Sequence, residues 1–318
     1  MIIVTGGAGF IGSNLINLLT KDLKNQIVSV DWNNRKNSNY FNKTIKKISP
    51  DKFSNFLNHN IKKIDLIVHL GAITSTTEKN INLIKENNID LSIFLWNWCV
   101  KNNKRFIYAS SAATYGDGKN KFEDKESSSY LSKLLPLNLY GWSKHIFDKF
   151  VIKQKTKPRQ FVGLKFFNVY GPNEFHKDEM RSIVLKVFQK ISNNEKIKLF
   201  KSHNPKFKDG EQVRDFIYIK DVVEIILWFI NNHKLNGIFN VGTGIPRSFN
   251  DLVKAVFKNS NKKQNVEFIN TPKSIRDQYQ YFTKANISKL RKIGYKNDFY
   301  SLEEGIEDYI KNFLIKSV

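Results

Sequence analysis

The sequence predicts an α/β protein in which a doubly wound parallel sheet carries a smaller C-terminal α/β lobe. Three observations favour this class. The chain opens with a short apolar run, a glycine-rich turn and an amphipathic helical pattern. Apolar runs of strand length then alternate with helical patterns, which is typical of βαβ units. Several of these runs end in small or hydroxyl residues, where a doubly wound sheet receives a ligand.

The composition fits a protein of the cytoplasm. The 318 residues are 41% hydrophobic, enough for one large two-lobed domain or two intimate ones. The one cysteine, Cys99, excludes an internal disulfide and favours a reducing compartment. The first residues lack the basic region of a signal peptide, and no apolar run reaches the ~18 residues that span a bilayer.

The chain is strongly basic, with 52 Lys and Arg against 29 Asp and Glu and a net charge of +23. Such a charge can indicate binding to nucleic acid or to a membrane surface. Here the lysines are spread along the whole chain instead of gathering in one tract. We therefore expect neither nucleic acid nor membrane as a partner, and a positive field that favours a phosphate-bearing substrate.

The first strand, residues 2–5, leads into Gly6, Gly9 and Gly12, and a helical pattern follows. Glycines let the backbone turn tightly and approach a pyrophosphate, which then lies at the N-terminus of the helix. Because the strand, turn and helix occur in this order, the segment predicts a Rossmann-like dinucleotide site.

The next strand, residues 27–30, ends in Asp31, at the spacing of the acid that bonds the ribose hydroxyls of NAD. Arg35 and Lys36 follow and would suit the 2′-phosphate of NADP, so both cofactors stay open. A buried strand then ends at Gly71 and Ala72, and hydroxyls at 74–77 either cover the phosphates or cap a helix. That helix is expected over 81–102, where Asn87 faces either the cofactor or solvent.

The strand over residues 105–111 ends in a hydroxyl cluster, and a polar loop over 117–136 follows it. The next helix carries Tyr140 and Lys144, which lie four residues apart and so share one helix face. A cation beside a phenol lowers the phenol's pKa, and such a tyrosine can exchange a proton with a carbinol or carbonyl during hydride transfer. Ser111 would hydrogen-bond the reacting oxygen.

The second half of the chain keeps short strands but loses the regular βα rhythm. Strands are expected near 161–172, 214–220 and 237–244, and helices over 180–193, 222–232 and 302–314, with Asp221 capping the middle helix. We expect a nucleotide-binding domain over 1–168, completed by segments returning around 214–246, and a substrate-binding lobe over 169–318. No Cys/His spacing of a metal site is present, so no metal is expected.

These motifs together resemble the extended short-chain dehydrogenase/reductase family of nucleotide-sugar enzymes, over essentially the whole chain. Within it the chain is most similar to the branch of ADP-L-glycero-D-manno-heptose 6-epimerases. The family marks are residues 5–12, 110–111, 140 with 144, 167–172, 214–218 and 240–244. The branch marks are residues 71–78, 108–116, 168–172 with His176 and Lys177, 200–203 and 279–283.

The resemblance implies an epimerisation at C6 of an ADP-heptose that is redox-neutral overall, because bound NADP oxidises C6 transiently. It also implies that the product is the heptose precursor of the lipopolysaccharide inner core. It implies that Tyr140 and Lys177 are the acid/base residues for the two epimers, that Lys144 binds the nicotinamide ribose, and that Ser111 contacts the reacting oxygen. It also implies a homo-oligomer, a homopentamer in this branch. From the residues alone, Lys177 is expected to be a solvated lysine in a charged loop.

Cofactor and substrate contacts also carry over by resemblance. The cofactor-binding residues are Gly6, Gly9, Phe10, Ile11, Gly12, Asp31, Trp32, Leu70, Gly71, Ala72, Ile73, Thr74, Asn87, Lys144, Val169 and Lys177. The substrate-binding residues are Ser111, Asn168, Glu179, Lys186, Phe200, Lys201, Ser202, His203, Arg214 and Tyr279. At positions 179 and 186 many members of the family carry a small hydroxyl residue and a histidine, whereas this chain has Glu179 and Lys186. Lys36 and Lys52 are candidates for reading the 2′-phosphate.

Three alternatives remain. One is another epimerase or dehydratase of the same family, acting on a UDP- or GDP-sugar; Ala112 and Ala113 stand where a dehydratase usually has acids. Another is a non-catalytic cofactor sensor, although such chains tend to lose the tyrosine or the lysine. The third is a basic nucleic-acid binder.

Overall fold

A computed structural model describes residues 1–21, 26–32, 44–276 and 279–317. Within this part of the chain, seven parallel strands form the central sheet, in the order β11-β6-β5-β4-β1-β2-β3. Their bounds are β1 (Ile2–Thr5), β2 (Ile27–Val30), β3 (Lys46–Ile48), β4 (Leu66–His69), β5 (Arg105–Ser111), β6 (Gln160–Phe166) and β11 (Gly237–Val241). The predicted doubly wound α/β fold is confirmed.

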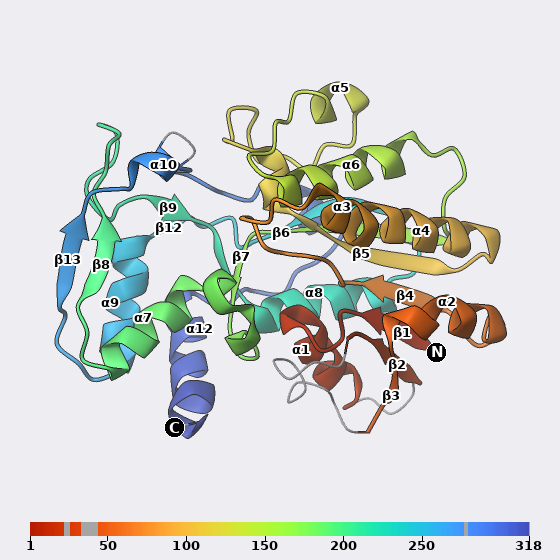
Figure 1. Cartoon of the computed structure of the whole chain (residues 1–318), viewed down its shortest axis with the longest axis horizontal. Coiled ribbons are helices and arrows are strands. Elements are labelled where there is room, and N and C mark those ends of the chain that lie inside the picture. Colours follow the sequence, from red (N-terminus) through yellow and green to blue (C-terminus); the bar gives the residue numbers. More distant parts are fainter. Residues whose placement is uncertain (22–25, 33–43, 277–278, 318) are drawn as a thin grey trace.

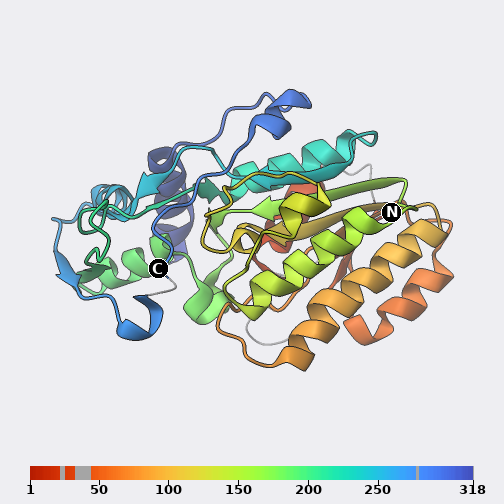
Figure 2. The same cartoon turned by 90° about the horizontal axis from the view of Figure 1, so that it is seen from above.

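Helices cover both faces of this sheet (Figures 1 and 2). One face carries α1 (Phe10–Leu19) and α8 (Ile219–Asn231), which pack on Ile2 and Val4 of β1. The opposite face carries α2 (Pro50–His59), α4 (Leu91–Lys101) and α6 (Leu139–Lys153), which lie side by side in Figure 2 and share a core with Ile3. Successive residues of β1 thus enter different cores, as the two-residue period of a strand requires.

The expected helix over 81–102 is present, with an irregular middle. It runs as α3 (Ile81–Ile84), a π-helical segment (Lys85–Asp90) and α4 without a break. The side chain of Asn80 accepts a hydrogen bond from the N–H of Leu83 and caps its start, so the hydroxyls at 74–77 do not cap it. Inserted π turns are frequent at functional sites because they change which side chains face inward.

The polar loop over 117–136 protects the edge of the sheet. Strand β11 lies at one edge, where unpaired N–H groups would invite another strand. The N–H groups of Ile238 and Asn240 instead donate to the carboxylates of Glu126 and Asp124, at 2.9 and 3.0 Å. The loop also holds the short helix α5 (Ser128–Leu131).

The C-terminal part of the chain builds a second group of short strands and helices, on the side away from β1–β4 in Figure 1. Its strand pairs are β7 (Asn168–Tyr170) with β10 (Phe216–Tyr218), β8 (Ile197–Phe200) with β13 (Val266–Ile269), and β9 (Val213–Arg214) with β12 (Arg247–Ser248). Its helices are α7 (Ile183–Ser192), α9 (Phe249–Asn259), α10 (Lys273–Arg276), α11 (Ser288–Lys292) and α12 (Leu302–Tyr309). The domain boundary at residue 168 stays a prediction.

Two expectations for this region change in detail. Helix α7 begins at Ile183 because residues 175–180 form a separate 3₁₀ turn. Asp221 does not cap α8: the helix has no side-chain cap, and the carboxylate accepts the N–H of Tyr300 at 3.2 Å. Burial raises the pKa of Asp221 to about 7. No helix among the described residues is both long and apolar enough to cross a membrane.

Candidate active site

The start of α6 places Tyr140 beside Ser111 at the carboxyl end of β5. The side chain of Asn138 accepts the N–H of Gly141 at 2.8 Å and caps the helix. A Cβ atom on Gly141 would lie 2.8 Å from the carbonyl oxygen of Ala113, so only glycine lets the helix approach the turn after β5 this closely. The side chains of Ser111 and Tyr140 are hydrogen-bonded. The structure therefore brings together the two hydroxyls that the sequence paired.

The expected lowering of the pKa of Tyr140 by Lys144 is wrong for the chain without ligands. Burial raises the pKa of Tyr140, and the hydrogen bond from Ser111 is the influence that lowers it. Burial also lowers the pKa of Lys144 to about 8, while the charge of Asp148 raises it. The physical reason is desolvation, which disfavours both the phenolate and the ammonium.

Asp148 is the centre of a buried polar network beneath this site. Its carboxylate accepts hydrogen bonds from Tyr108 at 3.0 Å, Ser110 at 2.8 Å and the ammonium of Lys165 at 2.6 Å. Lys165 also donates to Thr114 at 2.6 Å. The carboxylate and ammonium side chains are 0% and 1% exposed, so the pair is shielded from water. The network ties α6 to strands β5 and β6.

The glycine turn after β1 packs against the end of β4. Gly6 has φ of +67°, and a Cβ atom there would lie 2.7 Å from the backbone nitrogen of Gly71. A Cβ atom on Gly12 would lie 2.1 Å from the carbonyl oxygen of Gly6. The turn keeps its shape because no side chain fills it, which is the property a pyrophosphate cradle needs. Helix α1 begins at Phe10, directly after the turn.

Asp31 follows β2 and supports this turn. Its carboxylate accepts the N–H of Ala8 at 2.9 Å and the N–H of Trp32 at 2.8 Å. Burial raises the pKa of Asp31, whereas these N–H groups lower it. Trp32 is 55% exposed. Lys52 lies exposed on α2, while Arg35 and Lys36 lie outside the described residues.

The buried side chain of His69 connects Thr5 at the end of β1 with Ser92 of helix α4. Thr5 accepts the N–H of Gly71 at 3.1 Å through its hydroxyl oxygen, which lies 2.7 Å from Nδ1 of His69. Nε2 of His69 lies 3.0 Å from the hydroxyl of Ser92. Burial lowers the pKa of His69 to about 3, and the charge of Lys144 adds to the effect. His69 is therefore neutral and acts as a fixed hydrogen-bonding spacer.

Asn88 bridges Ile73 to Ser143 in the helix of Tyr140, and the cofactor contact expected of its neighbour Asn87 stays a prediction. The Asn88 side chain bonds both the N–H and the carbonyl of Ile73, at 2.8 and 2.9 Å, and donates to Ser143 at 3.0 Å. Ser143 in turn donates to the carbonyl of Tyr140 at 2.7 Å. Asn87 is half-buried and donates to a carbonyl of its own helix, that of Leu83, at 2.9 Å.

Lys177 lies in the 3₁₀ turn over residues 175–180, and this turn is attached to α1. Asn14 of α1 donates to the carbonyl of Pro172 at 2.9 Å, and Asn173 donates to Ser13 at 3.1 Å. The ammonium of Lys177 lies 5.1 Å from the centre of the Phe10 ring. Burial lowers the pKa of Lys177. Its half-buried place at the glycine turn is at odds with the solvated loop that the residues alone suggested.

Arg214 supplies a buried positive charge in the C-terminal part. Its guanidinium stacks at 5.6 and 5.7 Å from the ring centres of Phe249 and Tyr279, and it donates to the carbonyl of Val213. Among the described residues, no carboxylate forms an ion pair with it. Burial lowers its pKa to about 10. A buried guanidinium with this environment suits an anionic ligand.

The remaining predicted substrate residues of the C-terminal part lie at different depths. Phe200 and Tyr279 stack edge to face at 5.9 Å. His203 and Ser202 are held by the loop itself: His203 accepts the N–H of Thr271 at 3.3 Å, and Ser202 donates to Asn204. Lys201 and Asn168 of the predicted substrate set are exposed. Of the predicted cofactor residues, Thr74 is exposed, and Leu70, Ala72, Ile73, Ile11 and Val169 are partly buried.

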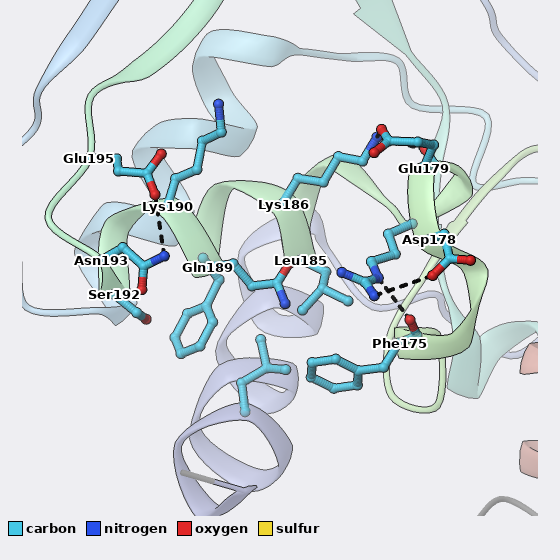
Figure 3. A pocket seen from close by; sticks show the side chains of 13 residues that line it. Phe175, Asp178, Glu179, Leu185, Lys186, Gln189, Lys190, Ser192, Asn193 and Glu195 are labelled. Carbon is cyan, nitrogen blue, oxygen red and sulfur yellow. Dashed lines mark hydrogen bonds and ion pairs between the residues drawn. The ribbon is translucent and has the colours of Figure 1, made fainter. Parts of the chain in front are cut away.

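Glu179 and Lys186 face an open hollow of about 1100 Å³ between the 3₁₀ turn and α7 (Figure 3). The Lys186 ammonium donates to the backbone carbonyl of Glu179 at 2.6 Å and lies 3.5 Å from its carboxylate. Phe175 and Leu185 also line the hollow, whereas Tyr140 and Ser111 do not. The two residues therefore pair with each other at a distance from the Tyr140 site.

The arrangement fits a nicotinamide dinucleotide. The glycine turn offers space that a Cβ atom would fill, and Lys144 is 5% exposed with no hydrogen-bond acceptor among the described residues. Lys144 would hold the nicotinamide ribose, and the N–H groups of the turn would hold the pyrophosphate. Sequence reasoning missed His69, Asn88 and Asp148. For Asp148, its position one helical turn after Lys144 was a usable signal.

Comparisons with known proteins agree with this geometry. The model of the NAD dependent epimerase/dehydratase family matches residues 2–242. The chain is 44% identical to the ADP-L-glycero-D-manno-heptose-6-epimerase of Fusobacterium nucleatum, over 99% of this chain and 98% of the relative, and 42% identical to that of Nitratidesulfovibrio vulgaris with the same coverage. The crystal structure of the Helicobacter pylori enzyme of that name superposes with a TM-score of 0.80 at 30% identity, covering 100% of this chain and 96% of that one.

The buried pair of Asp148 and Lys165 gives a stability prediction. Asp148→Asn leaves the Lys165 ammonium buried without its counter-charge, so we expect the free energy of unfolding to fall by about 3–5 kcal/mol. The double variant Asp148→Asn with Lys165→Met removes both charges and should recover most of the loss. Tyr108→Phe, which removes one hydrogen bond, should cost only about 1 kcal/mol. Urea unfolding measures all three; a double variant no more stable than Asp148→Asn would contradict the pairing.

Proposed function

The chain belongs to the NAD dependent epimerase/dehydratase family, and we propose that it interconverts ADP-D-glycero- and ADP-L-glycero-β-D-manno-heptose at C6. Relatives that carry this activity in their name match almost the whole chain, including the segments that hold Tyr140 and Lys177. The product would serve as the heptose precursor of the lipopolysaccharide inner core. We further propose that the protein is cytoplasmic and forms a homo-oligomer, a homopentamer by likeness to this branch.

One observation supports an epimerase more than a simple dehydrogenase. Two candidate proton-transfer groups come from different elements: Tyr140 from α6, beside Ser111, and Lys177 from the 3₁₀ turn after β7, beside Phe10 at the start of α1. An epimerase forms a ketone from one epimer and must protonate the oxygen again when the substituents at carbon have exchanged places. Two groups in different positions can serve the two orientations of that oxygen.

The chemistry follows from these positions. A nicotinamide held by Lys144 and the glycine turn would supply the hydride chemistry at C6, in both directions. Tyr140 takes the proton of the C6 hydroxyl of one epimer, and Ser111 donates a hydrogen bond to the resulting carbonyl oxygen. After the intermediate turns, Lys177 gives a proton to the same oxygen as the hydride returns to the other face. Lys144 would hold the cofactor's ribose, and the Ser111 hydroxyl favours the phenolate of Tyr140 during the first step.

The substrate's nucleotide would lie in the C-terminal part. The buried guanidinium of Arg214 matches a diphosphate in charge and shape. The rings of Phe200 and Tyr279 offer flat surfaces for a base or sugar. The net charge of +23 adds a general attraction for an anionic substrate.

The direct test supplies ADP-D-glycero-β-D-manno-heptose to the purified protein without free cofactor and separates the C6 epimers by chromatography. We expect conversion to an epimer mixture. Tyr140→Phe and Lys177→Met should each lower the rate by about 10²–10⁴-fold, because each removes one proton-transfer group. Lys153→Met, which changes an exposed lysine at the end of α6, is the matched control, because this lysine has no role in the proposed site. Wild-type protein that converts UDP- or GDP-sugars but not the ADP-heptose would contradict the proposed substrate.

We also propose NADP as the resident cofactor. Asp31 already accepts two backbone N–H groups, which reduces its capacity to select the free ribose hydroxyls of NAD. Acid release of the bound nucleotide, followed by enzymatic cycling assays specific for NADP or NAD, should identify NADP in the protein as purified. Recovery of NAD alone would overturn this assignment and leave the epimerase proposal standing.

A further inference from the structure

Glu174 is a completely buried carboxylate at the start of the turn that carries Lys177. The residue is 0% exposed and precedes the 3₁₀ turn over 175–180. None of the catalytic, cofactor or substrate roles described above uses it. A carboxylate is rarely buried this deeply unless it is paired or hydrogen-bonded, because its desolvation is costly.

The contacts of Glu174 close the Lys177 turn at both ends. At the near end it accepts the N–H of Gly171 at 3.4 Å. At the far end it accepts the N–H of Ser182 at 2.5 Å and the hydroxyl of Ser182 at 2.7 Å. The hydroxyl of Tyr309, from the C-terminal helix α12, lies 3.3 Å from the same carboxylate. One side chain thus joins the exit of β7, the start of α7 and the end of α12.

The turn between these ends is backbone-strained at the residue after Lys177. Asp178 has φ of +46° and ψ of −118°, a conformation that residues other than glycine rarely adopt. Arg181 holds the turn from the far side by donating to the carbonyl of Phe175 at 2.8 Å. Strain of this kind persists only where the surroundings over-determine the backbone. The clamp at Glu174 is one of those constraints.

The charges around Lys177 come from its own turn. Glu174 raises the pKa of Lys177 and so opposes the effect of burial. His176, Asp178 and Arg181 are the other titratable neighbours in the turn, and α1 contributes the uncharged ring of Phe10. Burial raises the pKa of Glu174 itself, while the Ser182 hydrogen bonds and the charge of Lys177 lower it.

We propose that Glu174 is a positioning residue for Lys177: it fixes the turn that presents the ammonium to the glycine turn, and its carboxylate favours the charged form of this half-buried lysine. The inference rests on the proposed function for its consequence in catalysis, but the placement and the charge coupling do not depend on the substrate. The hydroxyl of Tyr309 contacts the same carboxylate, so helix α12 also helps to hold the turn of Lys177.

The test is Glu174→Gln, which keeps the shape of the side chain and removes its charge. Trace labelling of the purified holoenzyme with acetic anhydride over a range of pH, read by peptide mass spectrometry, reports the protonation of Lys177 without any assay of activity. We expect the Lys177 labelling curve to move to lower pH by about one unit, because an opposite charge has been removed. The pH dependence of kcat for epimerisation should move in the same direction, with KM little changed.

Controls separate this role from a merely structural one. Glu195→Gln removes an exposed carboxylate after the end of α7 and should leave both curves unchanged. Tyr309→Phe and Ser182→Ala keep the charge of Glu174 but loosen the clamp, so they should lower kcat without moving the labelling curve. A folded Glu174→Gln protein with the wild-type labelling curve would overturn the charge coupling. If Glu174→Gln does not fold, a Ser182→Ala protein with wild-type kcat would overturn the clamp.

An inactive wild-type protein would overturn the proposed function and not this inference. In that case the labelling curves of wild type and Glu174→Gln still differ if Glu174 is the counter-charge of Lys177. Identical labelling curves, together with full epimerase activity of the wild type, would overturn this inference and leave the proposed function standing. The two proposals therefore fail in distinguishable ways.

Discussion

The position of helix α6 depends on the buried carboxylate of Asp148. This carboxylate accepts hydrogen bonds from Tyr108 and Ser110 of β5 and from Lys165 of β6. Removing its charge would leave the Lys165 ammonium buried without a partner and would cost much of the stability. The helix is thereby fixed in rotation and height, so Tyr140, about two turns earlier, meets Ser111 at the end of β5. The close packing that Gly141 permits at Ala113 completes this placement.

A second buried carboxylate plays the corresponding part on the other side. Glu174 fixes the turn of Lys177, and hydrogen bonds from Asn14 and Asn173 attach that turn to the glycine-turn helix. Both lysines of the candidate site are thus largely withdrawn from water, and each is influenced by one acid. Desolvation lowers the pKa of each lysine and so brings it closer to the range in which an ammonium can exchange a proton. The neighbouring acid opposes this shift.

Sequence reasoning reached the sheet, the glycine turn and the pairing of Ser111 with Tyr140, because these depend on local periodicity and on strands that end at one edge. It did not find the bridging role of Asn88, which lies in a π-helical segment, because composition gives no sign of such a segment. The roles of Lys177 and Glu174 were beyond derivation from residues alone, since Lys177 meets Phe10 and Glu174 meets Tyr309, two partners from distant parts of the chain. The sign of the pKa shift at Tyr140 was missed because burial raises this pKa, and the influence that lowers it comes from Ser111 and not from the charge of Lys144.

The central claim is that C6 is oxidised and reduced again by the same bound nicotinamide. The most direct measurement uses ADP-D-glycero-β-D-manno-heptose with deuterium at C6 in ordinary water, followed by mass spectrometry and NMR of the separated epimers. We expect the L-glycero product to keep its deuterium at C6, because a hydride held on the cofactor does not exchange with solvent. Product that has lost the label to water would show proton abstraction from carbon and would contradict the mechanism built on Tyr140 and Lys177.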